Sequence, residues 1–203
     1  MKKQKGFTLI ELLAVIAILA ILVLVATPAV TNIMTKSAKS SFKNEVMGFV
    51  KDADKAYTDK IGNEVNSRGN TSSTKTVVKN VTATDLATNV TKNYSYYCAT
   101  LSDLVNEQYT KKDLGTSYGG YIQMWVPDGE GETITFVAIT NSRFYVAGRT
   151  SDISPASYLA EQIPDNSLSL KDAKCPTTYD ILTTDSINNT IRTGYSANVS
   201  EGE

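Results

Sequence analysis

Histidine is absent from this chain, and cysteine occurs only twice in 203 residues. Histidine is the side chain best suited to general acid–base chemistry near neutral pH, and it is the usual nitrogen ligand of zinc. The two cysteines, Cys98 and Cys175, lie far apart and form neither a CxxC motif nor a metal-ligand spacing. We therefore predict that the chain is not an enzyme and that it holds no metal or cofactor.

An excess of charge of one sign is also absent. The 20 basic and 21 acidic residues leave a net charge of −1, so no basic field attracts nucleic acid, and we predict no nucleic-acid partner. The hydrophobic share of 41% and the chain length suit one membrane segment and one modest globular domain rather than two full domains.

The longest apolar run covers residues 7–30, and Glu11 is its only charged residue. As a helix this run is about 36 Å long, at about 1.5 Å per residue, which is enough to cross a hydrocarbon core of about 30 Å. Lys2, Lys3 and Lys5 precede it, so the positive-inside rule places the N-terminus in the cytoplasm.

Two ordinary explanations account for only part of this run. A secretory signal peptide usually has an apolar core of about 7–15 residues followed by an A-x-A-like site, whereas this core is longer and has no such site. A plain membrane anchor explains the length and the lysines. It does not explain Glu11, because a carboxylate in a membrane helix costs about 2.5–3.5 kcal/mol at the centre and less near the edge.

Residues 6–11, GFTLIE, resemble the class III signal of type IV prepilins. They follow a short basic leader and combine a glycine before the cut, an aromatic first residue and a glutamate at the fifth position after it. The resemblance, which covers about residues 3–30, implies that a prepilin peptidase removes residues 1–6 by cleaving between Gly6 and Phe7. It also implies N-methylation of the new Phe7 amine.

The same resemblance implies a role in assembly for three residues. The Glu11 carboxylate of an incoming subunit is expected to pair with the Phe7 amine of its neighbour, which fixes register because two buried charges tolerate each other better than either does alone. Pro28 stands where many family members carry a helix-bending proline, and it is expected to kink or locally melt the helix because it lacks an N–H.

After the apolar run, residues 31–61 are amphipathic. Charged residues, Lys43 among them, occupy the other faces, and Gly62-Asn63 is a plausible stop. We predict one helix over residues 7–61, with a transmembrane half at 7–30 and an amphipathic half at 31–61. Apolar residues recur there every three or four positions and predict one buried stripe, made of Ala38, Phe42, Val46, Phe49, Ala53, Tyr57 and Ile61.

Residues 62–203 are predicted to form a globular head. Residues 63–95 are rich in Asn, Thr and Ser and indicate an irregular region with one or two short strands. Residues 120–126, 133–140 and 143–149 have the composition and punctuation of an antiparallel meander. Short helices are expected at 101–109, with Val105 and Tyr109 inward, and at 154–163. The fold class is α+β, a long helix packed on an antiparallel sheet of three to four strands, as in the type IV pilin fold.

Two clusters in the head could each be assigned a binding function, but for both we favour a structural role. The residues Asp128, Glu130 and Glu132 lack the full pattern of a calcium loop and are predicted to form a solvated hairpin tip. Six aromatic residues could form a sugar-binding surface, but core packing is the more common role of such side chains. They are Tyr94, Tyr96, Tyr97, Tyr118, Tyr121 and Trp125.

Many proteins of this family pin their C-terminal region with a disulfide, and the two cysteines bracket the predicted sheet. Because the head is expected outside the cell, we predict a disulfide between Cys98 and Cys175, with two free thiols as the alternative. It would close a long loop and contribute about 4 kcal/mol of stability on a chain-entropy model.

The predicted function is that of a structural subunit of a type IV pilus, type IVa-like and from a Gram-positive or other AT-rich bacterium. The resemblance implies as partners other copies of the chain, a prepilin peptidase, an assembly ATPase, a platform protein and minor pilins. The subunit would span the cytoplasmic membrane before assembly and lie in an extracellular pilus afterwards, with roles in adhesion, twitching motility or DNA uptake. The alternatives are a minor pilin or type II secretion pseudopilin, and a tethered surface protein that does not assemble.

Overall fold

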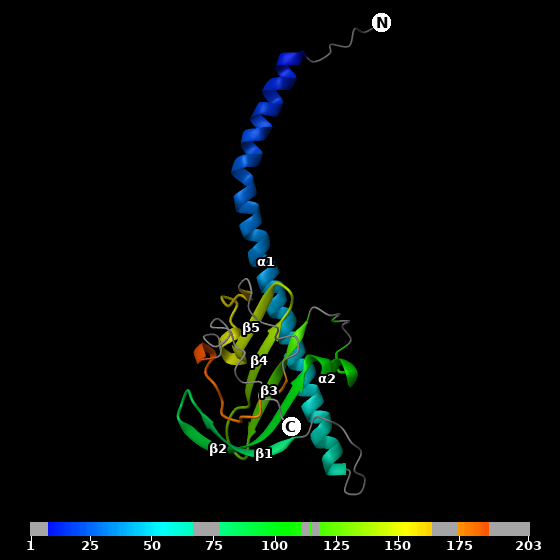
Figure 1. The fold of residues 1–203 in the computed structure, drawn as a ribbon, viewed down its shortest axis with the longest axis vertical. Helices are drawn as coiled ribbons and strands as arrows, with labels where there is room; N and C mark the ends of the chain where they lie inside the picture. Colours follow the sequence, from blue (N-terminus) through cyan, green and yellow to red (C-terminus); the bar gives the residue numbers. More distant parts are fainter. Residues whose placement is uncertain (1–7, 67–77, 111–113, 115–117, 164–173, 187–203) are drawn as a thin grey trace. The chain divides into compact units, whose positions relative to one another are not determined.

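The computed structural model describes residues 8–66, 78–110, 114, 118–163 and 174–186. These residues form one long helix followed by an antiparallel sheet with two short helices, α2 and α3, so the α+β class is confirmed (Figure 1). By compactness the chain divides into two units, Met1–Ala38 and Lys39–Glu203. The long helix α1, Leu9–Asn66, belongs to both.

Helix α1 differs from its predicted boundaries at the C-terminal end. The predicted stop at Gly62-Asn63 is wrong, because α1 continues to Asn66. A glycine inside a helix costs about 1 kcal/mol relative to alanine, and it ends a helix only where the chain turns into a left-handed conformation. The helix also runs without interruption through Pro28, so the backbone is not melted there.

The amphipathic part of α1 lies against the sheet within the second unit, on one face of β2–β5 (Figure 1). The predicted stripe is confirmed: Phe42, Val46 and Phe49 are buried, as are Ala53 and Tyr57 further along. The helix and the sheet meet through aromatic rings. The ring centroids of Phe42 and Phe144 are 6.3 Å apart, and those of Tyr57 and Tyr97 are 5.8 Å apart.

The prediction that Lys43 lies on a solvated face of the helix is wrong, because its side chain is buried and only 6% exposed. Its Nζ donates hydrogen bonds to the carbonyl oxygens of Ser154 and Pro155, at 3.1 and 3.2 Å. A buried ammonium is tolerated only where such acceptors replace water. Lys43 therefore ties α1 to the segment that follows the last long strand.

The sheet has six strands in the order β1-β2-β3-β4-β5-β6, and each neighbouring pair is antiparallel. The three predicted meander strands are confirmed as β3, Gly119–Pro127, β4, Ile134–Thr140, and β5, Phe144–Arg149. The other three are β1, Lys79–Asp85, β2, Val90–Thr100, and β6, Glu161–Gln162. The predicted count of three to four strands was therefore too low.

The one or two short strands predicted in residues 63–95 are confirmed as β1 and the start of β2, but the sequence analysis missed the C-terminal end of β2, which is buried on both faces. Tyr96 and Cys98 point to one face and Tyr97 and Ala99 to the other, and all four are buried. Strands covered on both faces lose the alternation of polar and apolar residues that marks a half-buried strand. The polar residues at its other end then made the segment resemble a loop.

The short helices also differ from expectation. Helix α2 covers Leu101–Asn106, and Val105, predicted inward, is exposed. The predicted helix over residues 154–163 is wrong: α3 occupies Thr150–Ile153, and residues 161–162 form β6. Proline suits the first turn of a helix but also suits tight turns, and Pro155 here lies in a turn.

The aromatic residues of the head pack in the core, as predicted, with Tyr118 half-buried. The aromatic residues on the sheet face opposite α1 belong to a hydrophobic cluster on that face. The C-terminal segment covers this cluster through Cys175, Tyr179, Ile181 and Leu182. The acidic tip at Asp128, Glu130 and Glu132 is exposed, as expected. The members of the cluster are Ala83, Tyr94, Tyr96, Cys98, Tyr121, Trp125, Phe136, Ala138, Tyr145, Ala147 and Ile181.

A disulfide joins Cys98 of β2 to Cys175, with 6.0 Å between the two Cα atoms. The two cysteines are 77 positions apart in the sequence, so the bond closes a long loop. It attaches the C-terminal segment to the middle of the sheet, where Trp125 Nε1 also donates to the carbonyl oxygen of Tyr179 at 2.9 Å.

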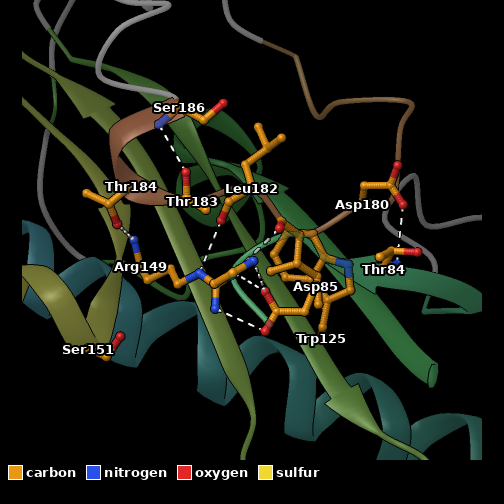
Figure 2. A network of polar contacts seen from close by, with 12 residues as sticks. Thr84, Asp85, Trp125, Arg149, Ser151, Asp180, Leu182, Thr183, Thr184 and Ser186 are labelled. Atoms are coloured by element: carbon orange, nitrogen blue, oxygen red, sulfur yellow. Dashed lines mark hydrogen bonds and ion pairs between the residues drawn. The ribbon is translucent and has the colours of Figure 1, made fainter. Parts of the chain in front are cut away.

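A buried ion pair holds the same segment further along (Figure 2). Arg149, at the end of β5, binds the carboxylate of Asp85 through both terminal nitrogens, and its Nε donates to the carbonyl oxygen of Leu182 at 3.1 Å. Two backbone bonds complete the attachment: the Ile181 N–H donates to the carbonyl oxygen of Thr84 at 2.9 Å, and the Leu86 N–H donates to that of Ile181 at 3.0 Å. We call Asp85, Arg149 and residues 179–184 the C-terminal latch.

Glycine at position 148 is required for this latch. Its φ is 144°, a backbone conformation that L side chains rarely adopt. A Cβ there would also lie 2.5 Å from Cγ2 of Thr184, whose hydroxyl accepts a hydrogen bond from the backbone N–H of Arg149. The C-terminal segment thus approaches β5 more closely than any side chain at position 148 would permit.

The ion pair of the latch should make stability depend on pH. The hydrogen bonds from the Arg149 side chain, with help from the Ala87 amide and against the effect of burial, lower the pKa of Asp85. A lowered folded-state pKa adds stability that is present above the unfolded pKa of about 3.9 and is lost as pH falls through the folded value. Replacing Asp85 by Asn should cost about 3–5 kcal/mol at neutral pH, because it leaves Arg149 buried and unpaired.

The measurement is denaturant unfolding of the full chain in detergent micelles, followed by Trp125 fluorescence across a pH series. Stability of the Asp85→Asn variant should change less than that of the parent below about pH 4. The matched control is Asp128→Asn, since that aspartate is exposed. Equal pH dependence of Asp85→Asn and the parent would show that the pair does not couple folding to protonation.

The disulfide leads to a second stability prediction. Replacing Cys98 and Cys175 together by Ser should lower the unfolding free energy by about 2–5 kcal/mol, because the unfolded chain regains the freedom of a long loop. Dithiothreitol should produce a similar loss in the parent chain and none in the double variant. The prediction would be contradicted if complete reduction left the unfolding free energy of the parent unchanged.

Candidate functional site: the amino-terminal helix

Glu11 lies in the first turn of α1 and is bonded to its own chain. Its Oε2 accepts hydrogen bonds from the backbone N–H of Thr8, at 2.8 Å, and from the Thr8 hydroxyl, at 2.9 Å. The backbone N–H of Glu11 in turn lies 3.3 Å from Thr8 Oγ1. Thr8 precedes the first helical residue, Leu9, so the two residues form a capping box at the start of the helix.

The capping box leaves part of the carboxylate available. Both bonds from Thr8 end on Oε2, and no donor to Oε1 occurs among the residues that the structure describes. A carboxylate has room for about four hydrogen bonds on its two oxygens. Glu11 is therefore held in a fixed place by Thr8 and can still accept a further donor, such as an ammonium group.

The surface around Glu11 is apolar and uncovered. Leu9, Ile10 and Leu12 are 81%, 74% and 63% exposed, and the large apolar residues that follow up to Met34 are also exposed. Within the described residues, this helix is long and apolar enough to cross a membrane. No exposed surface of this kind is stable in water, so a membrane or other protein must cover it.

Two threonine hydroxyls along this surface form hydrogen bonds to carbonyl oxygens of the same helix. The Thr27 hydroxyl donates to the carbonyl oxygen of Val23 at 2.6 Å, and the Thr35 hydroxyl donates to that of Thr31 at 2.9 Å. Such bonds allow polar residues to enter lipid, and they slightly bend helices. The first of them lies immediately before Pro28, where the helix lacks one backbone donor.

The structure describes some of the predicted site residues and not others. Gly6 and Phe7, the predicted cleavage and methylation positions, lie outside the described residues. Glu11 is described in full, and for Pro28 only its place within α1 is described. Cys98 and Cys175 lie in the head and form the disulfide.

Thr8 is the residue that the sequence analysis missed. The signal was present, because threonine followed three positions later by glutamate, just before an apolar run, is the pattern of a capping box. It went unused because Glu11 already had a proposed partner in another copy of the chain. The structure shows that Glu11 also has a partner within its own chain.

Residues 1–27 match the family model of the prokaryotic N-terminal methylation motif. Comparison with curated proteins and with solved structures gave no match. The helix, the sheet and this motif define an α+β protein whose apolar N-terminal helix fits anchoring in a membrane before assembly.

More particularly, the motif together with the long helix and antiparallel sheet supports a type IV pilin-like protein. The motif implies processing of the precursor by a prepilin peptidase and assembly in a type IV system. The sequence resemblance at the N-terminus and the fold of the head thus agree.

The capping box yields a prediction that does not depend on assembly. The Thr8→Val variant keeps the side-chain size but loses the hydroxyl, so the first turn of α1 should be destabilised by about 1 kcal/mol. Amide hydrogen exchange at Glu11, measured by NMR on the full chain in micelles, should become about fivefold faster. The matched control, Thr27→Val, removes a hydroxyl within the same helix and should leave exchange at Glu11 unchanged. Equal exchange in the parent and in Thr8→Val would refute the cap.

Proposed function

We propose that this chain is a structural subunit of a type IV pilus or a closely related filament. It polymerises through its N-terminal helix after a prepilin peptidase has cleaved between Gly6 and Phe7 and methylated the Phe7 amine. The observation that carries the proposal is the exposed carboxylate of Glu11 on an uncovered apolar helix, within the matched methylation motif.

Cleavage supplies the partner that this carboxylate needs. Removal of residues 1–6 takes away three lysines and creates a cationic amine on Phe7, at the start of the apolar surface. The amine of one subunit then binds Glu11 of the next at the open Oε1, while Thr8 continues to hold Oε2. Both charges are costly in an apolar environment alone, so the subunits are stable together only in the register that pairs them.

Helix packing supplies the remaining stabilisation. Ala14, Ala17 and Ala20 recur every three residues on the exposed helix, and small side chains permit close approach of neighbouring helices. The helices would leave the cytoplasmic membrane and form the filament core, residues 7–30 at the centre and 31–61 linking to the heads. The heads would form the outer surface of an extracellular pilus.

The proposal implies several partners and no reaction catalysed by the chain. An assembly ATPase and a platform protein would drive extraction from the membrane, and minor pilins would join the same filament. The work of the subunit is polymerisation, and its partner in that work is another copy of itself.

Two substitutions at Glu11 separate its charge from its capping role. Glu11→Ala should still insert into the membrane and be cleaved, but filaments should fall at least about tenfold, because an unpaired amine would be buried. Glu11→Gln keeps a side chain that can cap the helix and loses only the charge. It should fail to assemble in the same way. Sheared filaments are quantified by immunoblot against the membrane fraction.

The matched control is Glu130→Gln, at the exposed tip between β3 and β4, which should assemble normally. Normal filaments from Glu11→Ala would eliminate the pairing. Normal filaments from Glu11→Gln together with loss in Glu11→Ala would show that Glu11 acts as a helix cap and not as a charge.

A further inference from the structure

An open cleft of about 430 Å³ lies in the head, entirely within the unit Lys39–Glu203. Three parts of the fold line it: the β1–β2 hairpin around Asp85–Tyr94, the β3–β4 connection around Pro127–Thr135, and the junction of β5 with α3 at Arg149–Ser151. Asp85 and Arg149, the ion pair of the C-terminal latch, are among its lining residues. Its volume is in the range of small-molecule binding sites.

The charges around this cleft cancel. Asp85 is paired with Arg149 and is almost fully buried, so this part of the lining is fixed in place. Lys92 and Glu132 are exposed, and neither has an ion-pair partner among the described residues. A ligand in the cleft therefore meets one open cation and one open anion.

The rest of the lining combines hydroxyl groups with small apolar surfaces. Thr88 and Ser151 contribute hydroxyls from two of the three parts of the lining, and Thr133 and Thr150 add more. Val90, which is 43% exposed, and Ile134 provide apolar patches beside them. The Ser151 hydroxyl already donates to Asp152 at 3.1 Å, and the Thr88 hydroxyl is hydrogen-bonded to the Asp85 carboxylate, so both offer a ligand an acceptor. The hydroxyls of Thr133 and Thr150 can both donate and accept.

We propose that this cleft is a binding site for a neutral saccharide. A sugar presents hydroxyls that donate and accept in turn, together with apolar C–H faces, and both features match the lining. The cleft has one open positive charge and one open negative charge. A charged ligand would be repelled by one of them, whereas an uncharged ligand is repelled by neither. An anionic ligand would lie near the open carboxylate of Glu132, and a cationic one near the open ammonium of Lys92.

The inference goes beyond the proposed filament role and does not depend on it. The cleft uses none of the residues of the amino-terminal site, and a monomeric subunit would bind as well as a filament. It differs from the aromatic surface considered in the sequence analysis, because Tyr94 is 4% exposed and offers no ring face for stacking.

The test is saturation-transfer NMR on the full chain in lauryldimethylamine oxide micelles. The probes are glucose, galactose, mannose, N-acetylglucosamine and N-acetylgalactosamine at millimolar concentration, with N-acetylneuraminic acid as the anionic probe. At least one neutral sugar should show transfer. The variants Thr88→Val and Lys92→Met should each weaken it by about tenfold, since each removes hydrogen bonds to the sugar.

Two matched controls lie outside the lining. Thr91→Val removes a hydroxyl from the same hairpin, and Lys51→Met removes an exposed lysine of α1, and both should bind as the parent does. A third variant, Thr133→Trp, fills the exposed rim and should abolish transfer, with near-UV circular dichroism verifying that the head is folded. No transfer from any neutral sugar, transfer only from N-acetylneuraminic acid, or transfer that survives all three cleft variants would overturn the inference.

Discussion

The uncovered apolar surface at the start of α1 is the constraint on which the rest of the account depends. Large aliphatic side chains from Leu9 to Met34 are exposed in the single subunit. Each such side chain gains about 1.5–3 kcal/mol when it is moved out of water. The surface must therefore be covered at every stage. In the function that we propose, lipid covers it before assembly and neighbouring helices cover it afterwards, and both of these surroundings are apolar. The exchange between them needs little net energy, so it can be controlled by a single polar group.

We propose that Glu11 is that group, and its geometry shows how one carboxylate could serve two stages. In the single subunit, Thr8 binds Oε2 and caps the helix, which lowers the cost of holding a charge beside lipid. In the filament we propose, Oε1 receives the methylated amine of a neighbour without displacing Thr8. The head contributes stability of a different kind. The disulfide and the Asp85–Arg149 pair fasten the C-terminal segment to the sheet face opposite α1.

Features with a local pattern could be predicted from the sequence, and features made by distant partners could not. The apolar run, the amphipathic stripe of α1 and the strands β3, β4 and β5 repeat with the period of their structures, and they were predicted nearly in full. Lys43 was assigned to a solvated face because its acceptors lie more than 100 positions away. The pairing of Asp85 with Arg149 spans 64 positions and has no sequence motif. Thr8 differs from these, since its capping pattern is local and could have been recognised.

The most direct test of the central claim is the intact mass of the protein in filaments sheared from the cell surface. The account predicts a dominant species that lacks residues 1–6, carries one added methyl group and has lost two hydrogens to the Cys98–Cys175 bond. A trace of that species beside another abundant subunit would place the chain among minor pilins or pseudopilins. A chain that retains residues 1–6 and occurs only in membranes would contradict the account.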